Sequence, residues 1–206
     1  MSEELIERTI ANLRRNGFKA SFFPAREEVR KEILQIVRPG MTVGVPGSQT
    51  VRSLEVLEEL EKKGCVIYDH WRPGLSSQQI LEMRKKQLMA DLLLVGANAI
   101  TAEGEIVSVD GVGNRVASMI FGPGTKIVVV GRNKIVENRD RALERIRKVA
   151  APQRAKDLGF DLPCTRAEGC INCDDPQRIC RILVVLERCP VGSDMRVFII
   201  DEELGY

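Results

Sequence analysis

Apolar residues follow a helical period in several stretches of the chain. Near the N-terminus, the sequence ELIERTIANLRR places its apolar residues on one helical face, and Asn16-Gly17 ends this pattern. A capping box of Ser76 with Gln79 indicates the start of another helix. The same period predicts further helices over residues 24–37, 51–60, 77–88, 114–121 and 142–149.

Short apolar runs separate these helices and predict buried strands over residues 18–23, 41–45, 65–69, 91–95 and 126–130. Wholly apolar strands that alternate with helices indicate a mostly parallel sheet with helices on both faces. The predicted fold class is therefore α/β and doubly wound. Two more strands, 182–186 and 196–200, either pair as a hairpin or extend the edge of the sheet.

The chain is long enough for a single domain, and its 206 residues are 44% apolar and 29% charged. We expect an N-terminal helical segment (1–40), an α/β core (41–152) and a small extension (153–206) with a cysteine cluster and the last strands. A net charge of +2 and only 4% aromatic residues argue against a nucleic-acid partner.

The apolar runs are too short to span a membrane, and the mixed charge of the N-terminal helix is unlike a signal peptide. We therefore expect a cytoplasmic protein without a membrane partner. In that compartment, cysteines are more often reduced thiols or metal ligands than members of disulfides. The sequence leaves the oligomeric state open, a homo-oligomer included.

The first candidate site is the loop Val45–Thr50, which connects a strand to a helix. In open parallel sheets, ligands bind at the carboxyl ends of the strands. Here small and polar residues suit an anion that approaches the backbone closely, namely Gly44, Gly47, Ser48, Gln49 and Thr50. A turn with an ordinary serine or threonine N-cap explains the same residues equally well.

The second candidate site is the stretch Gly96–Arg115, GANAITAEGEIVSVDGVGNR, which follows a buried strand. Its pattern predicts a β-hairpin with Glu103 at the turn. The two ends of the hairpin supply polar groups for a ligand wall, namely Asn98, Asp110, Gly111, Asn114 and Arg115. The alternative interpretation is turns stabilised by the Asn and Asp side chains, with Asn114 as the N-cap of a helix.

The third candidate site is Val130–Val136, where Asn133 and Lys134 follow a buried strand. Its alternative is a solvated turn. His70, the single histidine of the chain, lies after another strand in DHWRPG. It belongs either to the rim of the site or to the ordinary surface.

Four cysteines near the C-terminus, Cys164, Cys170, Cys173 and Cys180, have the spacing C-x5-C-x2-C-x6-C. Four thiolates suit tetrahedral zinc or an iron–sulfur cluster. The spacing matches neither a two-knuckle zinc site nor a ferredoxin motif. A redox pair at Cys170 and Cys173, or a purely structural group of thiols, therefore stays open.

Four segments together resemble the lactate utilization domain (LUD) family. They are GSQT after a strand, GANAITAEGEIVSVDGVGNRVASMIFGP, KIVVVGRNKIV and PCTRAEGCINCDDPQRIC. The resemblance runs from about Arg14 to Tyr206. It implies a doubly wound fold of the NagB/RpiA/CoA-transferase-like type, a role in lactate or organic-acid utilization, and iron–sulfur oxidoreductase partners.

The resemblance implies a family more clearly than a reaction. Isomerases of related fold have an aspartate where this chain has Asn98, and an amide is not a general base. Glu103 is the nearest candidate for the nucleophilic glutamate of CoA transferases, but the pattern places it in a hairpin turn.

Three functional hypotheses follow. The first is a protein that binds a small anionic ligand in the cleft. The second is a non-catalytic or cluster-carrying component of an iron–sulfur oxidoreductase assembly. The third is an enzyme like a sugar-phosphate isomerase or a formyltetrahydrofolate cyclo-ligase.

Overall fold

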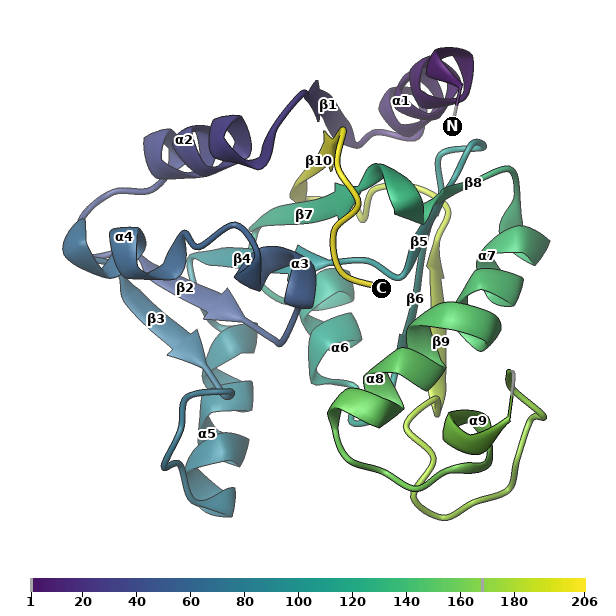
Figure 1. Cartoon of the computed structure of the whole chain (residues 1–206). Coiled ribbons are helices and arrows are strands. Elements are labelled where there is room, and N and C mark those ends of the chain that lie inside the picture. Colours follow the sequence, from purple (N-terminus) through teal and green to yellow (C-terminus); the bar gives the residue numbers. More distant parts are fainter. Residues whose placement is uncertain (1, 168) are drawn as a thin grey trace.

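A six-stranded parallel sheet lies at the centre of the computed structural model, which describes residues 2–167 and 169–206 (Figure 1). Its order across the sheet is β1-β10-β7-β4-β2-β3. The bounds are β1 (Lys19–Phe23), β2 (Thr42–Val45), β3 (Val66–Asp69), β4 (Leu92–Gly96), β7 (Thr125–Gly131) and β10 (Asp194–Ile200). The apolar runs thus form the predicted parallel sheet of an α/β fold.

Helices cover the sheet on both faces (Figure 1). They are α1 (Glu3–Arg15), α2 (Arg26–Ile36), α3 (Gln49–Arg52), α4 (Leu57–Lys62), α5 (Ser77–Leu88), α6 (Asn114–Phe121), α7 (Arg139–Arg145), α8 (Ala151–Asp157) and α9 (Pro163–Arg166). The predicted capping box of Ser76 and Gln79 starts α5. A π-helical turn, Ile146–Ala150, joins α7 to α8 in one helical run.

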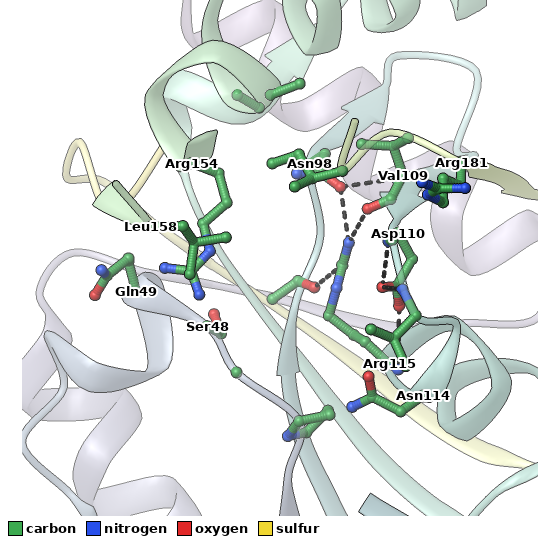
Figure 2. A pocket seen from close by; sticks show the side chains of 18 of the residues that line it. Ser48, Gln49, Asn98, Val109, Asp110, Asn114, Arg115, Arg154, Leu158 and Arg181 are labelled. Carbon is green, nitrogen blue, oxygen red and sulfur yellow. Dashed lines mark hydrogen bonds between the residues drawn. The ribbon is translucent and has the colours of Figure 1, made fainter. Parts of the chain in front are cut away.

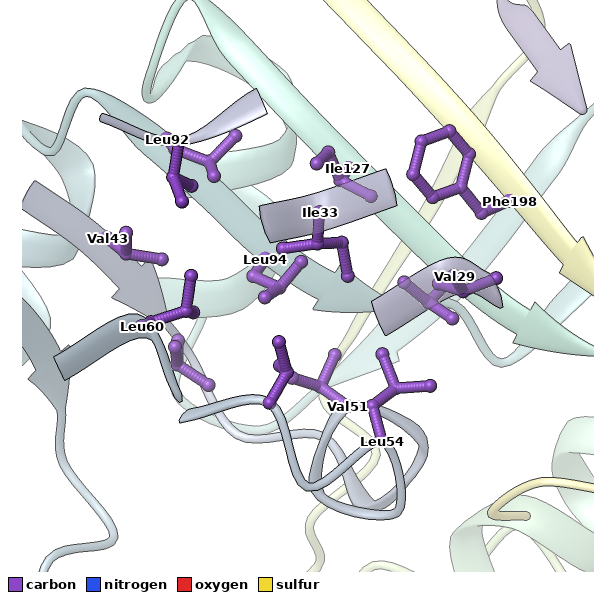
Figure 3. Close-up of a cluster of buried hydrophobic side chains, with 14 of the residues drawn as sticks. Val29, Ile33, Val43, Val51, Leu54, Leu60, Leu92, Leu94, Ile127 and Phe198 are labelled. Atoms are coloured by element: carbon purple, nitrogen blue, oxygen red, sulfur yellow. The ribbon is translucent and has the colours of Figure 1, made fainter. Parts of the chain in front are cut away.

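The central sheet separates two apolar cores, because successive side chains of a strand point to opposite faces. Leu92 and Leu94 of β4 face a core covered by α2, α3 and α4 (Figure 3). Leu93 and Val95 face a second core, to which α1 contributes Leu13. Burial of each such leucine stabilises the fold by about 2 kcal/mol.

A second sheet lies on the side of this second core. Its order is β8-β5-β6-β9, with bounds β5 (Ala99–Thr101), β6 (Ile106–Asp110), β8 (Ile135–Val136) and β9 (Ile182–Leu186). Strands β5 and β6 form the predicted hairpin. Ile100 and Ile106 face the second core, whereas Ala99 and Val107 pack against α7.

The last two strands follow neither of the two predicted alternatives. β9 pairs antiparallel with β6 in the second sheet, and β10 lies inside the central sheet, parallel to β1 and β7. The burial of the two strands explains this difference. Val197–Ile200 are buried without interruption, as in an interior parallel strand, whereas Ile182 and Leu183 of β9 are exposed.

The predicted helix over residues 51–60 is interrupted. It divides into α3 and α4, and Glu55 between them has a positive φ of 54°. Leu54 and Val56 are both buried. Residues two apart point in nearly opposite directions on a helix, so an uninterrupted helix would expose one of them.

In the part of the chain that the structure describes, no helix combines the length and the apolar character that crossing a membrane requires.

Candidate functional site

The candidate site lies where the connections of the central sheet change direction. From β2 the chain continues to β3 on one side, and then returns to β4 on the other side of β2. Ligands of open α/β sheets bind at such a switch point, beyond the carboxyl ends of the strands. A cavity of about 660 Å³ lies there, at the ends of β2, β3 and β4.

Most of the residues predicted for a ligand site line this cavity. They are Gly47, Ser48, Gln49, Asn98, Asp110, Gly111, Asn114, Arg115 and Lys134. Figure 2 shows Gln49 and Arg154 on one side of the view, and Asp110, Asn114 and Arg115 on the other. The structure therefore brings the three candidate loops together.

Arg115 is fixed by the strand ends around it. Its guanidinium donates to the carbonyl oxygens of Gly96 (3.0 Å) and Val109 (2.6 Å), and to Oδ1 of Asn98 (2.9 Å). The same Oδ1 accepts a hydrogen bond from the backbone N–H of Val109. Asn98 thus connects the end of β4 to β6 and to Arg115. Burial lowers the pKa of Arg115.

Asp110 caps the start of α6. Its carboxylate accepts hydrogen bonds from the backbone N–H groups of Gly111, Arg115 and Val116 at 2.7–3.2 Å. These donors occupy the lone pairs of the carboxylate. Asp110 therefore caps this end of α6, and because its lone pairs are occupied it is poorly suited to act as a general base.

The loop after β2 is shaped by two close approaches. A Cβ at Gly47, where φ is +83°, would lie 2.8 Å from atoms of the Trp71 ring. A Cβ at Gly96 would lie 2.5 Å from Oγ of Ser48. Ser48 accepts from the N–H of Val51 and so caps the single turn of α3. The glycines let this loop pack closely against the neighbouring loops.

His70 is a buried, neutral side chain on the cavity wall. Nε2 of Gln87 lies 3.0 Å from Nδ1 of His70 and equally close to the carbonyl oxygens of Val45 and Tyr68. An amide nitrogen donates and does not accept, so Nδ1 is the acceptor in this contact and the ring proton lies on the other nitrogen. Burial and then nearby Arg84 lower the pKa of His70 to about 4.

Positive charge dominates the cavity. Basic side chains on its wall are Arg84, Arg115, Lys134, Arg154, Arg178 and Arg181, and Asp110 is the single acidic side chain among the described lining residues. The guanidinium of Arg154 lies 4.3 Å from the centre of the Trp71 ring. Among the described residues, no ion pair engages Arg84 or Arg154, and the buried Nε of Arg84 has no hydrogen-bond partner.

Lys134 lies beside Thr50, deep in the site, with 3% of its surface exposed. Its Nζ donates to Oγ1 of Thr50 (2.7 Å) and to the carbonyl oxygen of Ala97 (3.2 Å). Burial, followed by the charges of Arg145 and Arg115, lowers the pKa of Lys134 to about 7. Thr50 itself donates to the carbonyl oxygen of Leu204, so it holds the C-terminal segment.

Four predicted residues lie outside the cavity lining, and Thr50, described above, is one of them. Gly44 is inside β2, where a Cβ would lie 3.0 Å from the carbonyl oxygen of Gln87. Asn133 holds the C-terminal segment through its hydrogen bonds with Leu204 and Gly205. Glu103 is in the hairpin turn, and its carbonyl oxygen accepts from Asn16. The structure does not bring Glu103 to the other candidate residues.

Sequence reasoning did not identify Arg84, Arg154 or Tyr206 as cavity residues. Arg84 is on α5 and Arg154 is on α8, and neither lies next to a strand end in the sequence. Tyr206 reaches the cavity because the C-terminal segment folds back, and its hydroxyl hydrogen-bonds to Asp157. A single arginine within a charged helix carries no local signal of such a position.

The four clustered cysteines lie in one lobe of the structure as free thiols. Burial and the proximity of Cys173, Cys170 and Cys180 raise the pKa of Cys164. Within residues 2–167 and 169–206, however, no three Cys, His, Asp or Glu side chains are arranged to hold a metal ion. The donor chemistry suits zinc or an iron–sulfur cluster, but this arrangement of the thiols does not fit one.

The loop between these cysteines forms one wall of the cavity. Pro176, Gln177, Arg178 and Ile179 of this loop line the cavity, as does Arg181 directly after Cys180. Arg178 donates to the carbonyl oxygen of Cys173 (2.6 Å) and to Sγ of Cys180 (3.4 Å). The cysteine loop is therefore part of the same site.

A comparison with known protein families matches residues 6–200 to the LUD domain. The chain belongs to the LUD domain family. This LUD domain protein is also similar to the crystal structure of a DUF162 family protein from Deinococcus radiodurans. The TM-score is 0.56 at 18% sequence identity, over 97% of this chain and 98% of the other. That likeness shows the fold alone, and a comparison with curated protein sequences finds no significant match.

Proposed function

We propose that this LUD domain protein binds a small anionic ligand in the cavity at the switch point. Through that ligand it would support the oxidation of lactate or a related organic acid, as the resemblance to the lactate utilization family implies. The proposed setting is the cytoplasm, where free thiols such as the six of this chain persist.

One observation carries the proposal, namely that Arg84 and Arg154 line the cavity without a carboxylate partner among the described residues. An arginine side chain is normally paired or fully hydrated, and a concave site strengthens its field. The single acidic side chain of the wall, Asp110, is already held by backbone N–H groups. An anion would supply the missing negative charge.

The size of the cavity narrows the class of ligand. A volume of about 660 Å³ falls within the range of about 300–1,000 Å³ that is usual for drug-sized ligands. Lactate alone would leave most of that space to water. A phosphorylated sugar or a nucleotide-like molecule fits better, because its anionic groups can reach several arginines at once.

A thermal-shift screen tests the proposal. Phosphate, pyrophosphate, ribose 5-phosphate, CoA esters, folates, L-lactate and pyruvate are compared at low ionic strength, because salt screens the interaction. At least one multivalent anion is expected to raise the Tm of the wild type, and the Arg84→Gln/Arg154→Gln variant should lose that shift. Arg147→Gln, an exposed arginine outside this cavity, is the matched control. Indifference of the wild type to every anion would refute the proposal.

The convergence of four thiols supports a second candidate function, a component of an iron–sulfur oxidoreductase assembly. The thiols would hold a cluster or zinc after the loop closes around it, or would contact a partner subunit. Purification without oxygen, followed by iron and zinc analysis and a visible spectrum, tests this candidate. If the purified protein holds neither iron nor zinc and no partner co-purifies with it, this second candidate function is contradicted and anion binding remains the proposed function.

A further inference from the structure

The starting point is an unusual lysine on the cavity wall. Lys134 has 3% of its surface exposed, yet its two hydrogen-bond acceptors, Oγ1 of Thr50 and the carbonyl oxygen of Ala97, are both neutral. In the part of the chain that the structure describes, no carboxylate forms an ion pair with it. A buried ammonium is normally paired with an anion, so this environment favours the uncharged amine.

The surroundings of Lys134 strengthen this preference. Arg145 and Arg115 both disfavour a positive charge at Nζ. Arg145 is held in place by the carbonyl oxygens of Asn133 (2.9 Å) and Asn98 (2.6 Å). These arginines are fixed by the backbone and cannot turn away from the lysine. The pKa of Lys134 is accordingly lowered to about 7, so a large fraction is neutral at physiological pH.

We propose that Lys134 is a nucleophilic amine that forms an imine with the carbonyl group of an anionic ligand, such as a 2-oxo acid or a sugar phosphate in its open form. The proposal rests on the anion site above, because the arginines would deliver the anionic group and hold the carbonyl near Nζ. A desolvated lysine next to other cations is a recognised way to activate an amine.

The proposed step balances without a further reagent. The lone pair of the neutral Nζ forms a bond to the carbonyl carbon, which gives a carbinolamine. The carbinolamine oxygen then leaves as water together with the two protons that were on Nζ. A C=N bond replaces the C=O bond, and nothing is oxidised or reduced. Thr50, whose Oγ1 accepts from Nζ, would keep the amine oriented.

The chain offers a matched control in Lys126. This lysine is 1% exposed, donates to Oγ of Ser193 (3.0 Å), and is also shifted to a lower pKa by burial. It does not line the cavity. Burial alone predicts similar behaviour for the two lysines, whereas the proposal predicts that Lys134 reacts and Lys126 does not.

The experiment traps the imine on the full chain. Protein is incubated with pyridoxal 5′-phosphate, an anionic aldehyde, or with propanal, a neutral one; it is then reduced with borohydride, digested and mapped by mass spectrometry. At pH 7.5 we expect Lys134 to be modified about tenfold faster than exposed lysines, because a much larger fraction of it is neutral. Its rate should rise with pH to a plateau with a midpoint near 7. Lys134→Arg should remove this modification, and Lys126→Arg should not.

The outcomes separate the two proposals. If Lys134 is modified and inorganic phosphate suppresses the modification, the result supports both the reactive amine and the anion site. Modification that phosphate leaves unchanged supports the reactive amine and contradicts the anion site. A Tm increase with phosphate, combined with modification of exposed lysines alone, overturns the reactive amine and retains the anion site. If neither aldehyde modifies Lys134 and phosphate does not raise the Tm, the reactive amine and the anion site are both overturned.

Discussion

Arg115 shows how one side chain connects the local structure to the site. Its guanidinium hydrogen-bonds to atoms of Gly96, Asn98, Ser108 and Val109, and so ties the end of β4 to the end of β6. These acceptors neutralise little of its charge but satisfy its donors, which is how a buried guanidinium becomes tolerable. The cavity wall depends on this arrangement, so Arg115 is better described as a positioning residue than as a free anion-binding group.

Arg115→Met is expected to destabilise the fold, because it leaves several buried acceptors without donors. Each unsatisfied group costs about 1–3 kcal/mol, so the free energy of unfolding should fall by roughly 3 kcal/mol. Urea denaturation followed by circular dichroism measures this change. The exposed Arg147→Met is the control and should alter stability by less than about 0.5 kcal/mol. Equal stability of the two variants would contradict the assigned role of Arg115.

His70 makes stability depend on pH. Its folded pKa of about 4 is below the unfolded value of 6.5, so between these values the unfolded chain binds more protons than the folded one. Stability therefore falls as the pH decreases from 6.5 to about 4, and this contribution is constant outside that window. Denaturant titrations between pH 4 and 7 should show a shallower decrease for His70→Gln than for the wild type. Identical slopes would show that His70 is not buried as a neutral ring.

The site depends on loops that pack against one another. The loop after β2 touches Trp71 after β3 through Gly47, and touches the end of β4 through Ser48. The cysteine loop closes another wall, where Gly111 leaves room for the carbonyl oxygen of Ile179. Glycines at these contacts let backbones and rings approach more closely than any side chain would allow.

Gly47→Ala is expected to disturb the site more than the fold. The new methyl group would displace the Trp71 ring, and with it Arg154, which lies over that ring. Affinity for a multivalent anion should fall about tenfold, equivalent to about 1.4 kcal/mol. Titration calorimetry measures the affinity. Gly74→Ala is the matched control, because Gly74 has nearly the same φ (+80°) and no neighbour within 4 Å. If both variants lose the same affinity for the anion, the effect comes from backbone strain and not from contact with Trp71.

The sequence predicted the strands of the central sheet and the three loops at their carboxyl ends. It could do so because apolar runs and helical periods are local signals. The placement of β9 and β10 depends on pairing with distant strands, β6 and β7, and no local pattern encodes it. Likewise, Arg84 and Arg154 reach the cavity from helices α5 and α8. Asp110 resembled a ligand residue because a helix cap and an anion-site residue use the same polar side chains.

Titration calorimetry with pyrophosphate at low ionic strength measures directly whether this cavity binds an anion. The wild type is compared with Arg154→Gln, and Arg147→Gln is the control outside the cavity. We expect one site per chain, an affinity about tenfold weaker for Arg154→Gln, and no change for Arg147→Gln. Equal binding by all three proteins, or no binding by the wild type, would contradict an anion site in this cavity.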